Sequence, residues 1–181
     1  MMKQSLRKEI ALLKNRYSDE DLRAFSDEIF LRMTQTQVFQ DAKCILAYHS
    51  FGQEVFTHDF IEKYAQEKKI ILPVVKEDNL VLKEYRGKDA LLKSDYGILE
   101  PTGSDFTDFS QIELGIIPGV VFDTKLNRLG RGKGYYDKLL SLLGNTYLIG
   151  ICFSFQLKDE ILVESHDFPM NSVITENGIV I

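Results

Sequence analysis

The segment "ELGIIPGVVFDTKLNRLGRGKGYYDKLL" (residues 113–140) contains an apolar run, a loop with three glycines and a second apolar run in direct succession. The run at 113–120 predicts a buried strand, and the run that starts at Tyr135 predicts a helix that Gly144 closes. This order puts the glycines at the carboxyl end of a sheet strand, which is where open α/β sheets bind their ligands. The segment therefore favours an α/β fold with a ligand site at the glycine loop.

The rest of the chain continues this alternation of strands and helices. Apolar runs predict strands, amphipathic runs predict helices that Ser18 and Thr57 can cap, and Asn177-Gly178 between two apolar runs predicts a hairpin. Short buried strands between helices indicate a mainly parallel sheet with an antiparallel addition. The predicted helices are 3–14, 18–36 and 58–69, the predicted strands are 44–50, 70–75, 80–86 and 146–153, and 87–111 is predicted to be a surface loop with short elements.

Length and composition indicate one cytoplasmic domain. With 181 residues the chain is most simply a single domain, 1–181. The sequence contains no stretch of 18 apolar residues, so no membrane span is predicted. The polar first residues lack the apolar core of a secretory signal. Cys44 and Cys152 lie far apart in apolar runs, which indicates two buried reduced thiols. Two cysteines and three scattered histidines do not suggest a zinc site.

The charges are concentrated in two basic segments of an acidic chain. The whole chain carries a net charge of −5, whereas residues 1–16 hold five basic residues and one acid, and residues 123–138 hold five basic residues and two acids. The acidic remainder repels nucleic acid in general. The two basic segments would bind a compact anion if they met in space. We therefore expect a small anionic ligand and no nucleic acid as partner.

The three loop glycines, Gly130, Gly132 and Gly134, suit a phosphate-binding backbone. Without Cβ atoms they permit positive φ angles and a close approach of the ligand, so successive N–H groups can converge on an anion at the start of the next helix. Arg131 and Lys133 add positive charges between these amides. The spacing is neither that of a Walker loop nor that of the dinucleotide fingerprint. The alternative is a flexible turn with solvated charges.

Three residues after the loop have two readings each. Asp137 lies in the first turn of the predicted helix, where it would either complement the helix dipole or hold Mg²⁺ together with phosphate oxygens and water. Tyr135 and Tyr136 would either pack against a flat ligand or pack inward. The residues alone therefore predict a phosphate-binding α/β protein.

The segment at 118–140 resembles the signature of the 5-formyltetrahydrofolate cyclo-ligases, also called 5,10-methenyltetrahydrofolate synthetases. Further elements of that family are similar in the same order along the chain. "KQSLR" resembles its N-terminal element, "SFGQEVFT" its folate-contacting segment, "GILEP" its mid-chain element and "HDFPMNSVITENG" its C-terminal run. These segments extend from residue 3 to residue 178, so the resemblance covers almost the whole chain.

The resemblance implies a three-layer α/β sandwich like that of the sugar-phosphate isomerase and CoA-transferase group. It also implies an ATP- and Mg²⁺-dependent ligase that cyclises 5-formyltetrahydrofolate to 5,10-methenyltetrahydrofolate and releases ADP and phosphate. The folate tail can carry several glutamates. By the same resemblance, Arg131 and Lys133 are the catalytic candidates and Asp137 is the Mg²⁺ ligand, although many relatives have glycine where Lys133 stands. The implied ATP-binding residues are Lys3, Arg7, Arg128, Leu129, Gly130, Arg131, Gly132, Lys133, Gly134, Tyr135 and Tyr136, and the implied folate-binding residues are His49, Phe51 and Glu54.

Other functions use part of the same pattern. A sugar-phosphate isomerase or a small-molecule kinase would use the glycine loop but would not need Lys3, Arg7 and Glu54. A non-enzymatic nucleotide-binding module would keep the loop without the reaction, and a nucleic-acid binder would need a long basic surface. We expect the ligase, acting as a monomer and without a membrane partner.

Overall fold

The computed structural model describes residues 2–77, 79–94, 97, 99–164 and 167–181. Its centre is a mixed sheet of seven strands in the order β12-β11-β9-β6-β1-β2-β3. The strands from β11 to β2 run parallel, and antiparallel hairpins add β12 and β3 at the edges. The strands are β1 (Cys44–Leu46), β2 (Lys69–Lys76), β3 (Asn79–Glu84), β6 (Leu114–Pro118), β9 (Tyr147–Ile151), β11 (Ser172–Thr175) and β12 (Gly178–Val180). The predicted parallel sheet with antiparallel additions is confirmed.

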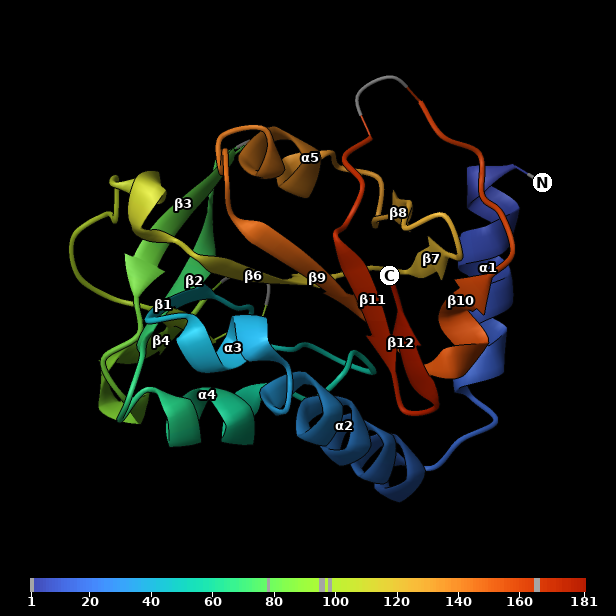
Figure 1. Ribbon diagram of the computed structural model, residues 1–181, viewed down its shortest axis with the longest axis horizontal. Helices are drawn as coiled ribbons and strands as arrows, with labels where there is room; N and C mark the ends of the chain where they lie inside the picture. Colours follow the sequence, from blue (N-terminus) through green and yellow to red (C-terminus); the bar gives the residue numbers. More distant parts are fainter. Residues whose placement is uncertain (1, 78, 95–96, 98, 165–166) are drawn as a thin grey trace.

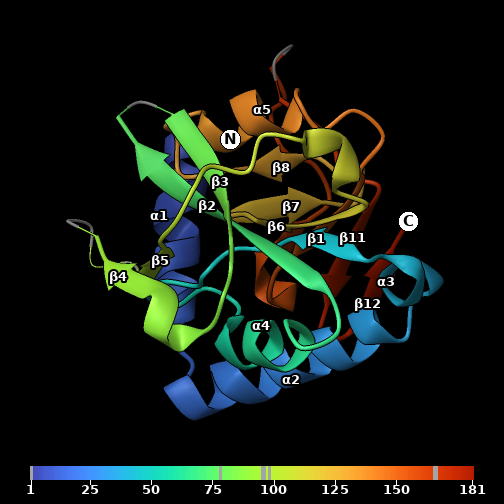
Figure 2. The same ribbon diagram turned by 90° about the vertical axis from the view of Figure 1, so that its left-hand side faces the viewer.

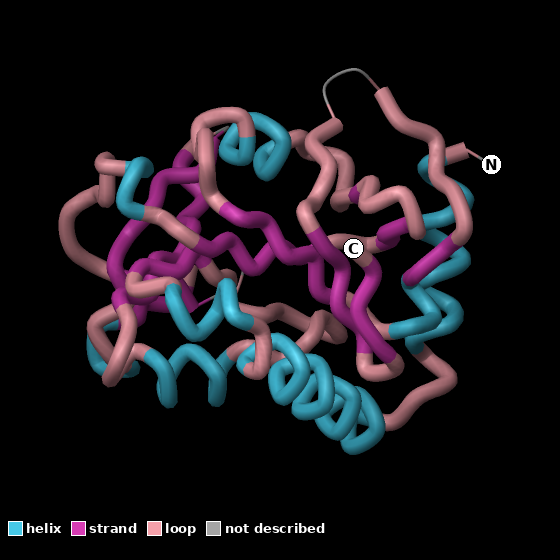
Figure 3. The backbone as a smooth tube through the Cα atoms, viewed as in Figure 1, coloured by secondary structure: helices cyan, strands magenta, loops and turns pink. Residues whose placement is uncertain are grey.

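Helices cover both faces of the sheet, so the predicted three-layer α/β architecture is confirmed (Figures 1 and 2). One face carries α2 (Asp19–Thr34), α3 (Gln37–Asp41) and α4 (His58–Tyr64). The other face carries α5 (Tyr135–Leu140) and a small sheet, and α1 (Lys3–Lys14) lies against that small sheet (Figure 3). Among the described residues no helix has both the length and the apolar character that a membrane span requires.

Helix ends follow local side-chain bonds. Ser18 begins α2 with a capping box that Asp21 completes, as predicted for Ser18. The predicted end of this helix near residue 36 is wrong because Thr36 accepts a hydrogen bond from the Phe39 N–H and so begins α3. The predicted helix after Tyr135 ends at Leu140 instead of Gly144, since the N–H groups of Leu142 and Leu143 make i→i−3 backbone bonds.

The predicted strand at 44–50 is wrong in its second half. After Leu46 the chain leaves the sheet, although residues 47 and 48 stay buried. The Thr57 hydroxyl donates to the Tyr48 carbonyl at 2.6 Å and accepts from the Ser50 N–H at 2.9 Å. The Thr57 hydroxyl therefore satisfies backbone N–H and C=O groups of the loop that would otherwise need a neighbouring strand. Because it is engaged there, it does not cap α4, and the predicted Thr57 cap is wrong.

Short elements complete the fold. The small sheet has the order β10-β7-β8, and α1 packs on it with Leu6 and Ile10. This packing holds the amino-terminal helix beside the glycine loop that follows β8. The remaining short elements are β4 (Leu91–Lys93), β5 (Leu99–Pro101), β7 (Val121–Asp123), β8 (Arg128–Leu129), β10 (Leu157–Lys158) and the 3₁₀ turns Lys88–Ala90, Phe109–Gln111 and Ser154–Gln156.

Both cysteines are buried and unbridged, as predicted. Burial raises the pKa of Cys44 to about 11 and raises the pKa of Cys152 further. The thiols therefore stay protonated and pack as small apolar side chains.

Candidate active site

A cavity of about 620 Å³ lies where β1 and β6 end, between the glycine loop, α1 and the hairpin of β2 and β3. Every residue predicted for ATP, folate or metal binding lines this one cavity. Side chains from β2, β3, β5 and the chain after β10 complete its wall. The lining residues are Lys3, Arg7, Tyr48, His49, Phe51, Glu54, Pro73, Val75, Leu80, Glu100, Pro118–Val120, Arg128–Asp137, Glu164 and Asp167.

The first basic segment reaches the cavity through α1. The Arg7 Nε donates to the Gly130 carbonyl at 2.9 Å. Gly132 adopts a φ of +101°, and a Cβ added there would lie 3.3 Å from the Arg7 guanidinium. The two basic segments therefore meet, which is the condition for binding a compact anion between them, and Gly132 allows the loop to pass close to Arg7.

Lys3 lies at the same cavity but is already paired with acids. Its Nζ donates to Asp167 at 2.8 Å and lies 3.2 Å from a Glu164 oxygen. Burial lowers the pKa of Lys3, but the hydrogen bonds that Lys3 donates to Asp167 and Glu164 outweigh this effect, so the net pKa is raised. The ammonium is therefore charged and would have to exchange carboxylate oxygens for phosphate oxygens to bind ATP.

Arg128 and Asp137 form a buried ion pair beneath the glycine loop. The Arg128 side chain is only 3% exposed, and its Nη2 donates to Asp137 Oδ1. A Cβ on Gly130 would lie 2.7 Å from Arg128 Nη1, so this glycine makes room for the guanidinium. Arg128 thus supports the loop from below and fixes the carboxylate predicted to bind Mg²⁺.

Asp137 offers a suitable donor for Mg²⁺. Its Oδ2 carries no protein hydrogen bond within the described ranges, since Arg128 uses Oδ1. The described residues contain no cluster of three His, Cys, Asp or Glu side chains for a metal ion. The Oδ2 of Asp137 fits a cation that takes one or two carboxylates and completes its shell with phosphate oxygens and water, as Mg²⁺ does.

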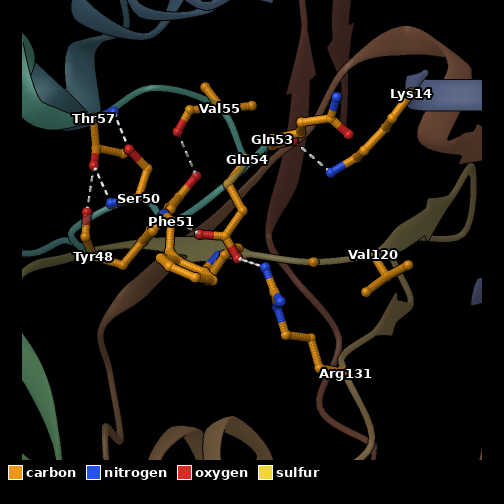
Figure 4. A network of polar contacts seen from close by, with 12 residues as sticks. Lys14, Tyr48, Ser50, Phe51, Gln53, Glu54, Val55, Thr57, Val120 and Arg131 are labelled. Atoms are coloured by element: carbon orange, nitrogen blue, oxygen red, sulfur yellow. Dashed lines mark hydrogen bonds and ion pairs between the residues drawn. The ribbon is translucent and has the colours of Figure 1, made fainter. Parts of the chain in front are cut away.

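Arg131 crosses from the glycine loop to the predicted folate segment. Its Nη2 donates to Glu54 Oε1 at 2.6 Å, while Glu54 Oε2 accepts from the Phe51 N–H at 3.0 Å (Figure 4). Glu54 is therefore fixed by the turn that carries it and by a cation from the opposite wall. This contact places the predicted ATP and folate residues next to each other.

Lys14 was missed by the sequence reasoning and belongs to the same network. Figure 4 shows it reaching from α1 to the Gln53 carbonyl, at 2.6 Å. Burial lowers the pKa of Lys14, with Glu54 raising it and Arg131 lowering it. The signal was present in the sequence, because Lys3, Arg7 and Lys14 share one face of a helix with 3.6 residues per turn. Lys14 holds the turn that presents Glu54.

The aromatic residues divide between the cavity and the core. Tyr136 packs against the apolar cluster of α5 and the sheet, and burial raises its pKa. Tyr135 lies beside Lys133, whose Nζ is 5.5 Å from the centre of the ring. Tyr136 is therefore the inward tyrosine, and Tyr135 is the better placed of the two to contact a ligand.

His49 stacks on His58 with ring centres 3.8 Å apart. Burial and the neighbouring His58 lower the pKa of His49 to about 4. The ring is therefore neutral near pH 7, where it can pack against a flat ligand without bringing a charge.

We expect His49 to make folding stability depend on pH between about 6.5 and 4. In this range the unfolded histidine takes up a proton while the folded one does not, so the free energy of unfolding falls as the pH drops. Urea titrations at pH 7 and pH 5 should show a smaller difference for His49→Asn than for the unchanged chain. Equal pH dependence of the two proteins would contradict the lowered pKa.

Comparisons with known proteins agree on one family. A sequence model described as the 5-formyltetrahydrofolate cyclo-ligase family matches residues 1–176. The 5-formyltetrahydrofolate cyclo-ligase of Escherichia coli K12 is 30% identical over 146 residues, which cover 76% of this chain and 80% of the relative.

Two further relatives extend this agreement. A probable 5-formyltetrahydrofolate cyclo-ligase of Schizosaccharomyces pombe is 34% identical over 107 residues, so the match spans about half of each chain, 51% of this one and 52% of the relative. The NMR structure of Aquifex aeolicus 5,10-methenyltetrahydrofolate synthetase superposes with a TM-score of 0.88 at 28% identity, covering 99% of this chain and 92% of the other.

Proposed function

The chain belongs to the 5-formyltetrahydrofolate cyclo-ligase family, and we propose that it cyclises 5-formyltetrahydrofolate to 5,10-methenyltetrahydrofolate at the expense of ATP and with Mg²⁺. The observation that carries the proposal is the single cavity in which the glycine loop, Arg7 and Glu54 converge. A nucleotide phosphate chain and a folate have to meet in one site for this reaction. The contact between Arg131 and Glu54 joins the two sets of residues.

The chemistry requires positioning and charge neutralisation more than a protein nucleophile. The formyl oxygen attacks the γ-phosphorus of ATP, the bond to the bridging oxygen breaks, and ADP leaves. The folate N10 then adds to the activated carbon, phosphate departs with the former formyl oxygen, and a proton is lost from N10. Such a transfer depends on alignment of the reacting groups and on cations around the phosphoryl group.

Each part of the cavity would supply one of these requirements. The loop amides, Arg7 and Lys3 would hold the phosphates, and Arg131 would neutralise charge between nucleotide and folate. Asp137 would hold Mg²⁺, which neutralises phosphate charge when bound. Glu54 would bind folate N–H groups, with Phe51 beside the ring. Lys133 would contribute charge at the edge of the loop.

The product provides a direct test. Purified protein with ATP, Mg²⁺ and 5-formyltetrahydrofolate should develop the near-ultraviolet absorbance of the conjugated methenyl product. Replacing ATP by an analogue with a non-transferable γ-phosphoryl group, or chelating Mg²⁺ with EDTA, should stop the increase. Folded protein that binds both substrates and yet produces no absorbance would overturn the proposed activity.

A further inference from the structure

One carboxylate in the cavity wall differs from the others. Glu54 pairs with Arg131, Asp137 pairs with Arg128, and both Glu164 and Asp167 pair with Lys3. Within the described part of the chain, Glu100 has no cationic partner and only one protein hydrogen bond. That bond comes from the Val75 N–H to Oε1, at 3.3 Å.

Several described residues beside Glu100 are apolar. Glu100 lines the cavity together with Pro73 and Val75 of β2 and Leu80 of β3, and its bond to the Val75 N–H places it next to Val75. Phe51 lies close to the same segment, since a Cβ on Gly97 would be 3.9 Å from its ring. A carboxylate on such a wall loses hydration when a flat ligand covers it, and that loss is offset only if the ligand donates hydrogen bonds. Glu100 can accept several hydrogen bonds, because a carboxylate has about four acceptor positions.

We propose that Glu100 determines specificity for the 2-amino-4-oxopyrimidine ring of the folate, an assignment that rests on the proposed function. The N3–H and the 2-amino group of that ring are neighbouring donors on one edge, so the two oxygens of one carboxylate can accept from both. Such charge-assisted pairs are strong and directional. The apolar side chains beside Glu100 would pack against the faces of the ring.

Adenine is the competing flat ligand, and its donor pattern fits less well. Its amino group has the acceptor N1 as direct neighbour, so a carboxylate that accepts from the amine would bring its second oxygen toward a lone pair. Glu54, which would bind other folate N–H groups, is the competing acceptor for this edge of the pyrimidine ring. It already accepts from the Phe51 N–H and from the Arg131 guanidinium, whereas Glu100 carries no such charge partner.

The test compares Glu100→Gln with Glu84→Gln by calorimetric titration of 5-formyltetrahydrofolate and, separately, of ADP. Glutamine at position 100 keeps a carbonyl oxygen that can accept from the Val75 N–H. Glu84→Gln on β3 also removes one negative charge, but Glu84 is not among the residues that line the cavity. Glu100→Gln should weaken folate binding roughly 10- to 100-fold and change ADP binding less than twofold. Glu84→Gln should leave both unchanged.

A folate analogue with a methyl group in place of the 2-amino group allows the protein change and the ligand change to be combined in a thermodynamic cycle. The unchanged protein should lose affinity for this analogue, and Glu100→Gln should lose little more, because both changes remove the same contact. Unaltered folate affinity in Glu100→Gln, or a larger loss for ADP than for folate, overturns the assignment while the proposed function stands. Equal affinity of the unchanged protein for 5-formyltetrahydrofolate and for the analogue also overturns the assignment, whether or not the variant folds. Failure of the unchanged protein to bind 5-formyltetrahydrofolate overturns the proposed function and this assignment with it.

Discussion

Asp137→Ala is expected to lower both the stability and the activity of the protein, whereas Asp137→Asn should lower the activity strongly and the stability much less. Alanine leaves the Arg128 guanidinium, only 3% exposed, without its partner. An unpaired buried charge of this kind costs about 3–5 kcal/mol of unfolding free energy. Asparagine keeps an oxygen that can accept from Arg128, but it is a neutral and weaker ligand for Mg²⁺. We expect its Mg²⁺ requirement to rise about 100-fold or more.

Thermal unfolding and Mg²⁺ titrations of the absorbance assay separate the two roles. The double variant Arg128→Met with Asp137→Leu removes the pair as a whole, so it should regain most of the stability lost in Asp137→Ala and none of the activity. An unchanged Mg²⁺ titration for Asp137→Asn would leave Asp137 with a structural role only, as the partner of Arg128 beneath the loop.

The glycine-loop side of the cavity could be predicted from local signals in the sequence, whereas the roles of Arg7 and Glu54 were implied by the family resemblance. The glycine loop follows a buried strand, and Arg7 lies on a clearly amphipathic helix. The bond from Arg7 to the Gly130 carbonyl then confirms that segments 123 residues apart meet. The charge distribution alone did not predict this meeting, because two basic segments repel each other unless an anion or acidic side chains lie between them.

The features that could not be predicted arise from contacts between segments that are short or lie far apart in the sequence. β8 contains two residues, too few for any periodic pattern, so the small sheet has no signal in the sequence. The burial of Arg128 follows from that sheet, which explains why its pairing with Asp137 was missed. Likewise, the run at 44–50 resembles a strand throughout, because its own composition does not show that the Thr57 hydroxyl replaces strand partners at Tyr48 and Ser50.

Phe122 of β7 packs into the main sheet, and this contact gives the second prediction. Phe122 is fully buried, and its ring fills a hollow left by two glycines. A Cβ on Gly150 would lie 2.4 Å from the ring, and one on Gly119 would lie 2.5 Å from it. Phe122→Ala is therefore expected to cost about 3–5 kcal/mol of unfolding free energy. Because β7 pairs with β8, the change should also misplace the glycine loop.

Phe39→Ala is the matched control for that effect. Phe39 is buried on the opposite face, where it packs against Phe60 and Tyr64. Its truncation should cost a similar amount of stability but leave the glycine loop in place. Urea titrations and ATP titrations on the folded variants should therefore give two destabilised proteins, of which only Phe122→Ala binds ATP several-fold more weakly. Equal ATP affinities would show that the loop keeps its position without Phe122, so that α1 and the Arg7 bond to Gly130 suffice to hold it.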